Sequence, residues 1–146
     1  MIKRLIGVNI AVKDLDAAVK RYEDVLGIKP QFLKPEDFAL PGIKGAFFRV
    51  GDGLINLLTS EQPETSIAKF LETRGEGLFL IELEVTDAEQ ATKELLEKGV
   101  KLVSDKPLPF EGGKVNFSHP KSMHGVMMAF AQLWSGAAGL PEGDDG

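Results

Sequence analysis

The stretch GVNIAVKDLDAAVKRYEDVLG, residues 7–27, predicts a buried strand that leads directly into an amphipathic helix. After the strand, apolar side chains recur every three or four residues, which is the spacing of a helix that packs on one face. Asp14 is a suitable N-cap, and Gly27 is a suitable residue to end the helix. The stretch is therefore one strand–helix unit with defined ends.

A second copy of this pattern, LIELEVTDAEQATKELLEKG, follows at residues 80–99. A constant offset of 73 residues aligns the copies and pairs these positions: Asp14 with Asp87, Gly7 with Leu80, and Asn56 with Ala129. Each half of the chain therefore has a strand, a helix and three further strands. We expect an α+β fold of two βαβββ modules, related by a pseudo-twofold axis, whose curved mixed sheets enclose a shared cleft.

The boundaries follow from the turn-forming residues between these patterns. The first module is expected over residues 1–62, a linker helix over 63–77 and the second module over 78–134. In the second module, strands are expected at 100–104, 114–120 and 126–134, with a loop at 105–113. The tail at 135–146 has little to bury and two adjacent acids, so it is predicted to be disordered.

The bulk composition narrows the class of partner and the chemistry. The 146 residues carry a net charge of −5, which argues against nucleic acid and against anionic membrane surfaces. Cysteine is absent, so disulfides, thiolate metal sites and cysteine nucleophiles are excluded. No signal peptide and no transmembrane segment is predicted. An acidic chain without cysteine suits a cytoplasmic protein.

Five stretches resemble a known family: IAVKDLDAAVKRYEDVLG (10–27), TSIAKFLETRGEG (65–77), LEKGVKLVSDKP (96–107), GGKVNF (112–117) and HPKS (119–122). Together with the two βαβββ modules, they resemble the vicinal oxygen chelate superfamily of glyoxalases, dioxygenases and bleomycin-resistance proteins. Within that superfamily they are similar to the methylmalonyl-CoA epimerases.

The resemblance implies a metal site whose ligands this chain lacks. The family binds a divalent metal through two histidines, a glutamate and often a glutamine; here those positions hold Gly7, Leu80, Ala129 and Asn56. One amide cannot hold a hard divalent ion, so we expect no metal and no other cofactor. A further family glutamate, which acts as a base, falls near Gly45. Restoring both histidines and the glutamate is expected to create metal affinity.

Strand alternation then predicts which residues face the cleft. The cleft candidates are Asn9, Arg49, Asn56, Glu82 and Met127. Glu82 is the candidate catalytic residue, since a desolvated carboxylate has a raised pKa and can act as a general base. The alternative is that Glu82 pairs with Arg49 or lies at a wet rim.

The HPKS stretch supplies three more candidates for substrate binding: His119, Lys121 and Ser122. The resemblance places this stretch beside the substrate entrance, where it could contact a carboxylate or phosphate. The alternative is that these residues serve a turn.

Two functions remain open at this point, and whether the chain is an enzyme is undecided. One is a metal-independent isomerase or lyase that acts on an acyl thioester, such as a CoA thioester, or on a small carboxylate. The other is metal-free sequestration of a drug or metabolite, of the bleomycin-resistance type. A catalytically silent subunit is a third possibility. A homodimer is expected in each case.

Overall fold

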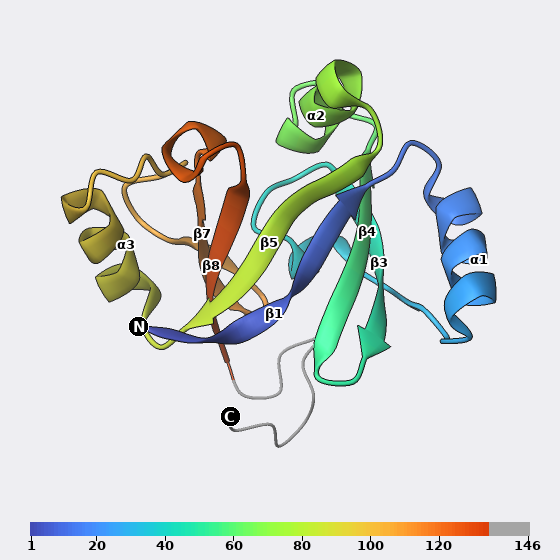
Figure 1. The fold of residues 1–146 in the computed structure, drawn as a ribbon, viewed down its shortest axis with the longest axis horizontal. Helices are drawn as coiled ribbons and strands as arrows, with labels where there is room; N and C mark the ends of the chain where they lie inside the picture. The colour runs from blue at the N-terminus through green and yellow to red at the C-terminus, as the bar shows by residue number, and fades with distance from the viewer. Residues whose placement is uncertain (135–146) are drawn as a thin grey trace.

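Each half of the chain forms the predicted strand–helix–strands unit in the computed structural model, which describes residues 1–134 (Figure 1). The first unit contains β1 (Ile2–Ala11), α1 (Leu15–Leu26), β2 (Gln31–Phe32), β3 (Ile43–Val50) and β4 (Gly53–Ser60). After α2 (Ser66–Arg74), the second contains β5 (Gly77–Val85), α3 (Ala88–Glu97), β6 (Leu108–Phe110), β7 (Gly113–Ser118) and β8 (Met127–Leu133). Two short 3₁₀ helices are η1 (Pro35–Asp37) and η2 (Pro120–Met123). The tail predicted to be disordered, 135–146, lies outside the described residues.

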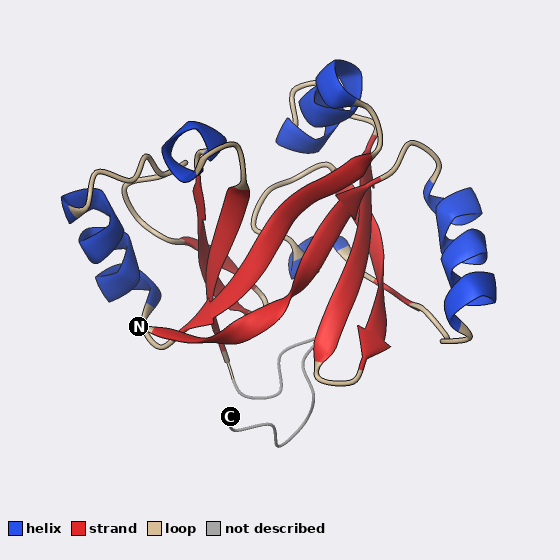
Figure 2. Ribbon diagram, in the orientation of Figure 1, coloured by secondary structure: helices blue, strands red, loops and turns tan. Residues whose placement is uncertain are grey.

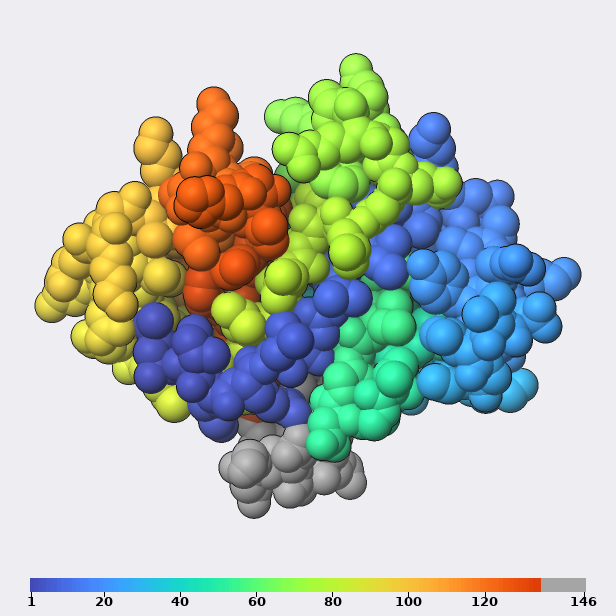
Figure 3. Space-filling view, in the orientation of Figure 1, coloured from blue at the N-terminus to red at the C-terminus, as the bar shows by residue number. Residues whose placement is uncertain are grey.

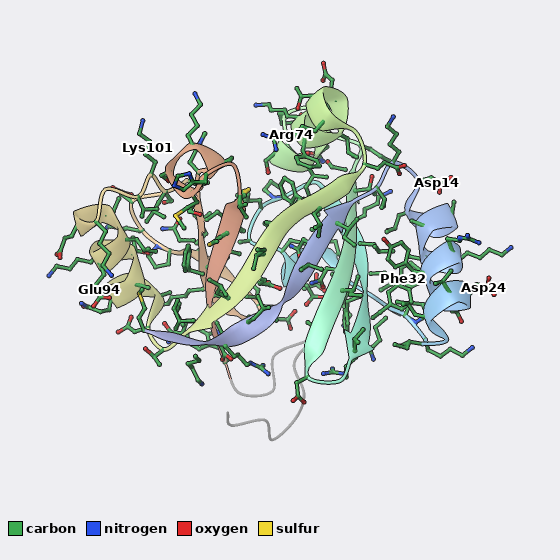
Figure 4. The ribbon with its side chains drawn as sticks, in the orientation of Figure 1. Asp14, Asp24, Phe32, Arg74, Glu94 and Lys101 are labelled. Atoms are coloured by element: carbon green, nitrogen blue, oxygen red, sulfur yellow. The ribbon has the colours of Figure 1, made fainter. Side chains whose placement is uncertain are left out.

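The repeated helices begin at equivalent residues because each has an aspartate cap. Asp14, at the start of α1 (Figure 4), accepts a hydrogen bond from the Ala17 backbone N–H at 3.0 Å. Asp87 does the same for the first turn of α3. Gly27 ends α1 with φ of 70°, a left-handed conformation that glycine adopts without steric cost. The capping signals in the sequence are therefore confirmed.

The strands form one curved sheet in the order β2-β3-β4-β1-β5-β8-β7-β6. Within each half the first strand runs parallel to the last, and the halves join where β1 pairs antiparallel with β5. Helix α1 packs on β3 and β4, and α3 packs on β7 and β8, at opposite ends of the sheet (Figure 2). The predicted α+β fold with two related modules is confirmed, and the modules pair within one chain.

The expected strand at 100–104 is wrong. Only Leu102 makes an isolated bridge, to Ser118, while Val100 and Leu102 pack against the core under α3. The strand β6 forms instead at Leu108–Phe110, inside the segment expected to be a loop, and pairs antiparallel with β7. Pro109 fits there because β6 lies at the edge of the sheet, where a missing N–H costs little.

The remaining element boundaries lie close to those expected from the sequence. Strand β4 ends before residue 62, α2 lies within 63–77, and β5 begins one residue early, at Gly77. Among the described residues, no helix is both long enough and apolar enough to cross a bilayer.

Candidate active site

A cavity of about 360 Å³ opens on the concave face of the sheet. Both halves of the chain line it: Asn9 and Asn56 come from β1 and β4, while Leu80, Glu82 and Met127 come from β5 and β8. Because the seam between β1 and β5 runs through its floor, neither half can form the cavity alone. The structure therefore has a cleft shared between the modules.

Glu82 lies between two of the positions that the family uses for metal ligands. In the sheet register it is opposite Gly7 on β1 and opposite Ala129 on β8. Neither neighbour carries a polar side chain that could pair with the carboxylate. The carboxylate therefore takes the middle of a row where the resemblance predicts a metal.

The surroundings of Glu82 are electrostatically unusual. It is half-buried in the cavity wall, and no residue within 1–134 forms an ion pair or hydrogen bond with its carboxylate. Burial alone raises its pKa from 4.5 to about 7. The alternative pairing with Arg49 does not occur. At neutral pH this group therefore exchanges a proton readily, as a general base must.

Glu84, two residues further along β5, shows the contrast. It is buried, but its carboxylate accepts a hydrogen bond from Arg4 Nε at 2.8 Å and lies 3.7 Å from Lys3 Nζ. No such partner balances Glu82. The two glutamates thus separate into one structural ion pair and one unpaired group that faces the cavity.

Two asparagines form the polar part of the cavity floor. Asn56 Nδ2 donates to Asn9 Oδ1 at 2.9 Å and to the Val8 carbonyl at 3.4 Å. No described residue accepts a hydrogen bond from Asn9 Nδ2. In the register, Asn9 is opposite Leu80, so it lies two residue pairs along the seam from the Gly7–Glu82 pair. Asn9 can therefore donate to a ligand oxygen on the same face as the carboxylate.

Simple alternation places Gly7 on the cleft face, and this is wrong. Register shifts on either side of Leu5 and at Asn9 disturb the alternation, so that Ile6, 2% exposed, enters the concave core. A Cβ on Gly7 would lie 2.0 Å from the backbone oxygen of Leu54. A histidine therefore cannot be placed at this position without moving β4. This argues against rebuilding the metal site by the three expected substitutions, which stays a prediction.

Four predicted site residues lie outside the cavity lining. Arg49 is near the end of β3, opposite Leu54. The other three, His119, Lys121 and Ser122, belong to η2 and its cap. Their hydrogen bonds serve the turn: Ser122 Oγ donates to the His119 carbonyl at 3.0 Å and accepts from the Lys101 N–H at 3.2 Å. Figure 4 shows Lys101 beside this turn. A role for these four in binding stays a prediction.

Part of the cavity wall comes from segments that strand alternation cannot reach. Phe38 and Leu40 follow η1, and Thr65 and Ile67 belong to the start of α2. The apolar run FALPGI at 38–43 is the one signal in the sequence, since a loop with that many apolar residues must cover something. These segments close the cavity on the side opposite the sheet.

The residues present do not fit a divalent metal. Gly7, Leu80 and Ala129 carry no donor atom, and Asn56 offers one amide. Across residues 1–134, no three His, Cys, Asp or Glu side chains come together as a metal-binding group. Hard divalent ions need several oxygen or nitrogen ligands, which this cavity does not supply.

Comparison with known proteins agrees with this fold. Residues 8–117 match the family model described as the Glyoxalase/Bleomycin resistance protein/Dioxygenase superfamily. The ethylmalonyl-CoA/methylmalonyl-CoA epimerase of Cereibacter sphaeroides is 34% identical over 136 residues, which cover 91% of this chain and all of that protein.

Two solved epimerases superpose over most of the chain. Methylmalonyl-CoA epimerase from Mycobacterium tuberculosis has a TM-score of 0.80 at 31% identity, covering 91% of this chain and 89% of that one. The enzyme from Streptomyces coelicolor, solved with 2-nitronate-propionyl-CoA, has a TM-score of 0.82 at 25% identity, covering 91% and 99%.

Proposed function

The chain belongs to the Glyoxalase/Bleomycin resistance protein/Dioxygenase superfamily, and from that premise we propose a metal-independent enzyme of the isomerase or lyase type. Its substrate is an acyl thioester or a small carboxylate, and it moves a proton at the carbon beside the carbonyl group. One observation carries the proposal: Glu82 faces the cavity, desolvated and without a partner in residues 1–134. The epimerases that this chain resembles supply the substrate class.

In the proposed reaction, Glu82 transfers the proton and Asn9 stabilises the negative oxygen. The ionised Glu82 carboxylate takes a proton from the α carbon, and the electron pair of the C–H bond moves into the adjacent carbonyl, whose oxygen becomes negative. Asn9 Nδ2 donates a hydrogen bond to that oxygen, which lowers the energy of the enolate. The protonated Glu82 then returns a proton, to the same carbon or to another carbon of the conjugated system.

The number of acids in the cavity limits the outcome. Three acids line the cavity in the described chain, but Asp37 accepts a hydrogen bond from the Lys34 N–H at 2.8 Å and Glu64 is exposed, so we assign proton transfer to Glu82, on a single face. Inversion of a stereocentre needs a second group on the opposite face. Proton exchange, a double-bond shift or an elimination on one face is therefore favoured over the two-base epimerisation of a malonyl thioester.

Deuterium exchange tests the proposal. In heavy water, we expect the wild-type protein to incorporate deuterium at the α carbon of short acyl-CoA thioesters, measured by mass spectrometry. Glu82→Gln should lower that rate at least about a hundredfold, the usual contribution of a general base. The matched control is Glu97→Gln, an identical change at an exposed position on α3, outside the cavity. Equal rates for wild type and Glu82→Gln would exclude Glu82 as the base.

A second function is ligand sequestration without chemistry. It is favoured by the enclosed, mainly apolar wall that Phe38, Ile67 and Met127 provide, which suits binding of an apolar molecule. In that case no thioester exchanges deuterium with the wild-type protein, and Glu82→Gln changes affinity for a ligand rather than a rate.

A further inference from the structure

We infer that the cavity accepts an uncharged acyl group and rejects one that bears a free carboxylate, and that Glu82 is the residue that sets this specificity. The inference rests on the proposed function, since it takes the cavity as the substrate site. It narrows the substrate class, because it separates this chain from a preference for malonyl-type thioesters.

The first observation is the sign of the charges around the cavity. Three ionisable side chains line it in the described part of the chain, and all are acids: Asp37 on η1, Glu64 just before α2, and Glu82 on β5. No lysine, arginine or histidine within residues 1–134 belongs to the lining. A substrate carboxylate would therefore enter a site of its own sign.

The second observation is that the cations on β1 and β3 do not line the cavity. Lys3 and Arg4 both pair with Glu84, further along the concave face. Arg49 lies outside the lining, near the end of β3. An arginine fork or a lysine is the usual partner of a buried carboxylate, and neither reaches this cavity.

The third observation is the row of residues across the cavity floor. Glu82 lies between Gly7 and Ala129 in the register, so neither neighbour in its row offers the carboxylate a polar partner. A second carboxylate beside it would combine desolvation with like-charge repulsion. An uncharged acyl group meets neither cost, and it fits the apolar wall around Leu80 and Met127.

Two pairs of ligands test the inference by isothermal titration calorimetry at pH 8, where Glu82 is ionised. Isobutyryl-CoA and methylmalonyl-CoA differ by exchange of a methyl group for a carboxylate. The amide 4-phenylbutyramide and the acid 4-phenylbutyrate make the same comparison without CoA. We expect the wild-type protein to bind the uncharged member at least about tenfold more tightly, equivalent to 1.4 kcal/mol.

The variants assign the effect to one residue. Glu82→Gln should reduce the preference to about threefold or less by letting the carboxylate ligand in, whereas Glu97→Gln should keep it in full. Equal affinity of the wild-type protein for charged and uncharged members overturns the inference. A preference that survives Glu82→Gln also overturns it. So does a wild-type protein that binds none of the four ligands.

The two proposals fail separately. If only the CoA-free pair binds and shows the preference, the specificity stands and the thioester function falls. If isobutyryl-CoA exchanges deuterium but methylmalonyl-CoA binds equally well, the thioester function stands and the specificity falls.

Discussion

At the scale of single residues, the unpaired Glu82 makes folding of this chain depend on pH. In the folded protein, burial holds its proton up to a pKa of about 7, whereas the unfolded chain loses that proton near 4.5. Between these values the folded state binds more protons, so the free energy of unfolding decreases as the pH rises. The destabilisation is complete above pH 7 and absent well below 4.5.

Removal of this charge should therefore stabilise the protein, and more so at high pH. The free energy of unfolding of Glu82→Gln minus that of wild type is expected to be about 3 kcal/mol larger at pH 8 than at pH 4. Urea titrations of both proteins at the two pH values measure the difference. A gain that is the same at pH 4 and pH 8 would show that Glu82 has an ordinary pKa in the folded state.

How far the sequence predicts individual site residues depends on how regular each strand is. Alternation from Leu80, Asn56 and Ala129 places Glu82 and Met127 in the cleft lining, because β4 pairs with β1, and β5 with β8, without a register shift. It fails at Gly7, since the shift depends on how β1 fits between β4 and β5, and no local pattern encodes that fit. The apolar cover from η1 and α2 depends on how loops fold back and was not predictable from alternation.

At the scale of elements, strand β1 depends on glycine at one position. Gly7→Ala would place a Cβ 2.0 Å from the Leu54 backbone oxygen, so β1 and β4 must separate. We expect a loss of about 2 kcal/mol or more in the free energy of unfolding, typical of overpacking that moves a backbone. Thermal and urea denaturation measure it.

Gly53→Ala is the matched control on the neighbouring strand. A Cβ there would meet its nearest atoms, the carbonyl oxygens of Ile6 and Val50, at 3.6 Å, an ordinary contact. Its effect should stay within about 1 kcal/mol of wild type. If both alanine variants are equally stable, the close approach of β1 to β4 is not present in solution.

Element boundaries followed the sequence where a cap or a turn fixed them. Asp14, Gly27 and Asp87 set the ends of α1 and the start of α3 through contacts within a few residues. The strand expected at 100–104 was wrong because its apolar residues, Val100 and Leu102, were already needed under α3. Their hydrophobicity indicates that they are buried, but it does not indicate whether they pack under a helix or pair as a strand of the sheet.

At the scale of the whole molecule, the outer face of the central strands is not covered by a helix. Figure 3 shows atoms of β1 and β5 at the surface between the two halves. Leu5 on β1 is 59% exposed there, and the register pair Val8 and Ile81 lies half-buried further along the seam. An apolar sheet surface of this kind favours a second copy of the chain as its cover.

We therefore predict a homodimer, with sedimentation at twice the 15.9 kDa of the chain. Leu5→Glu should raise the dissociation constant at least about tenfold, because it places a charge in the apolar contact. Val25→Glu, a similar change at an exposed position on α1, should leave it unaltered. A wild-type species near 15.9 kDa at all concentrations would contradict the dimer.

The seam between β1 and β5 also sets the time at which the cavity appears during folding. It pairs Ile2 with Val85, so its two strands are brought together across more than half of the described chain. Hairpins such as β3–β4 and β7–β8 close over much shorter distances and are expected to form earlier, since contacts distant in sequence form slowly. Asn9 and Glu82 meet only across that late seam. A nascent chain that has completed these hairpins would still have no cavity, and it would acquire one only when β1 and β5 pair and join the two halves.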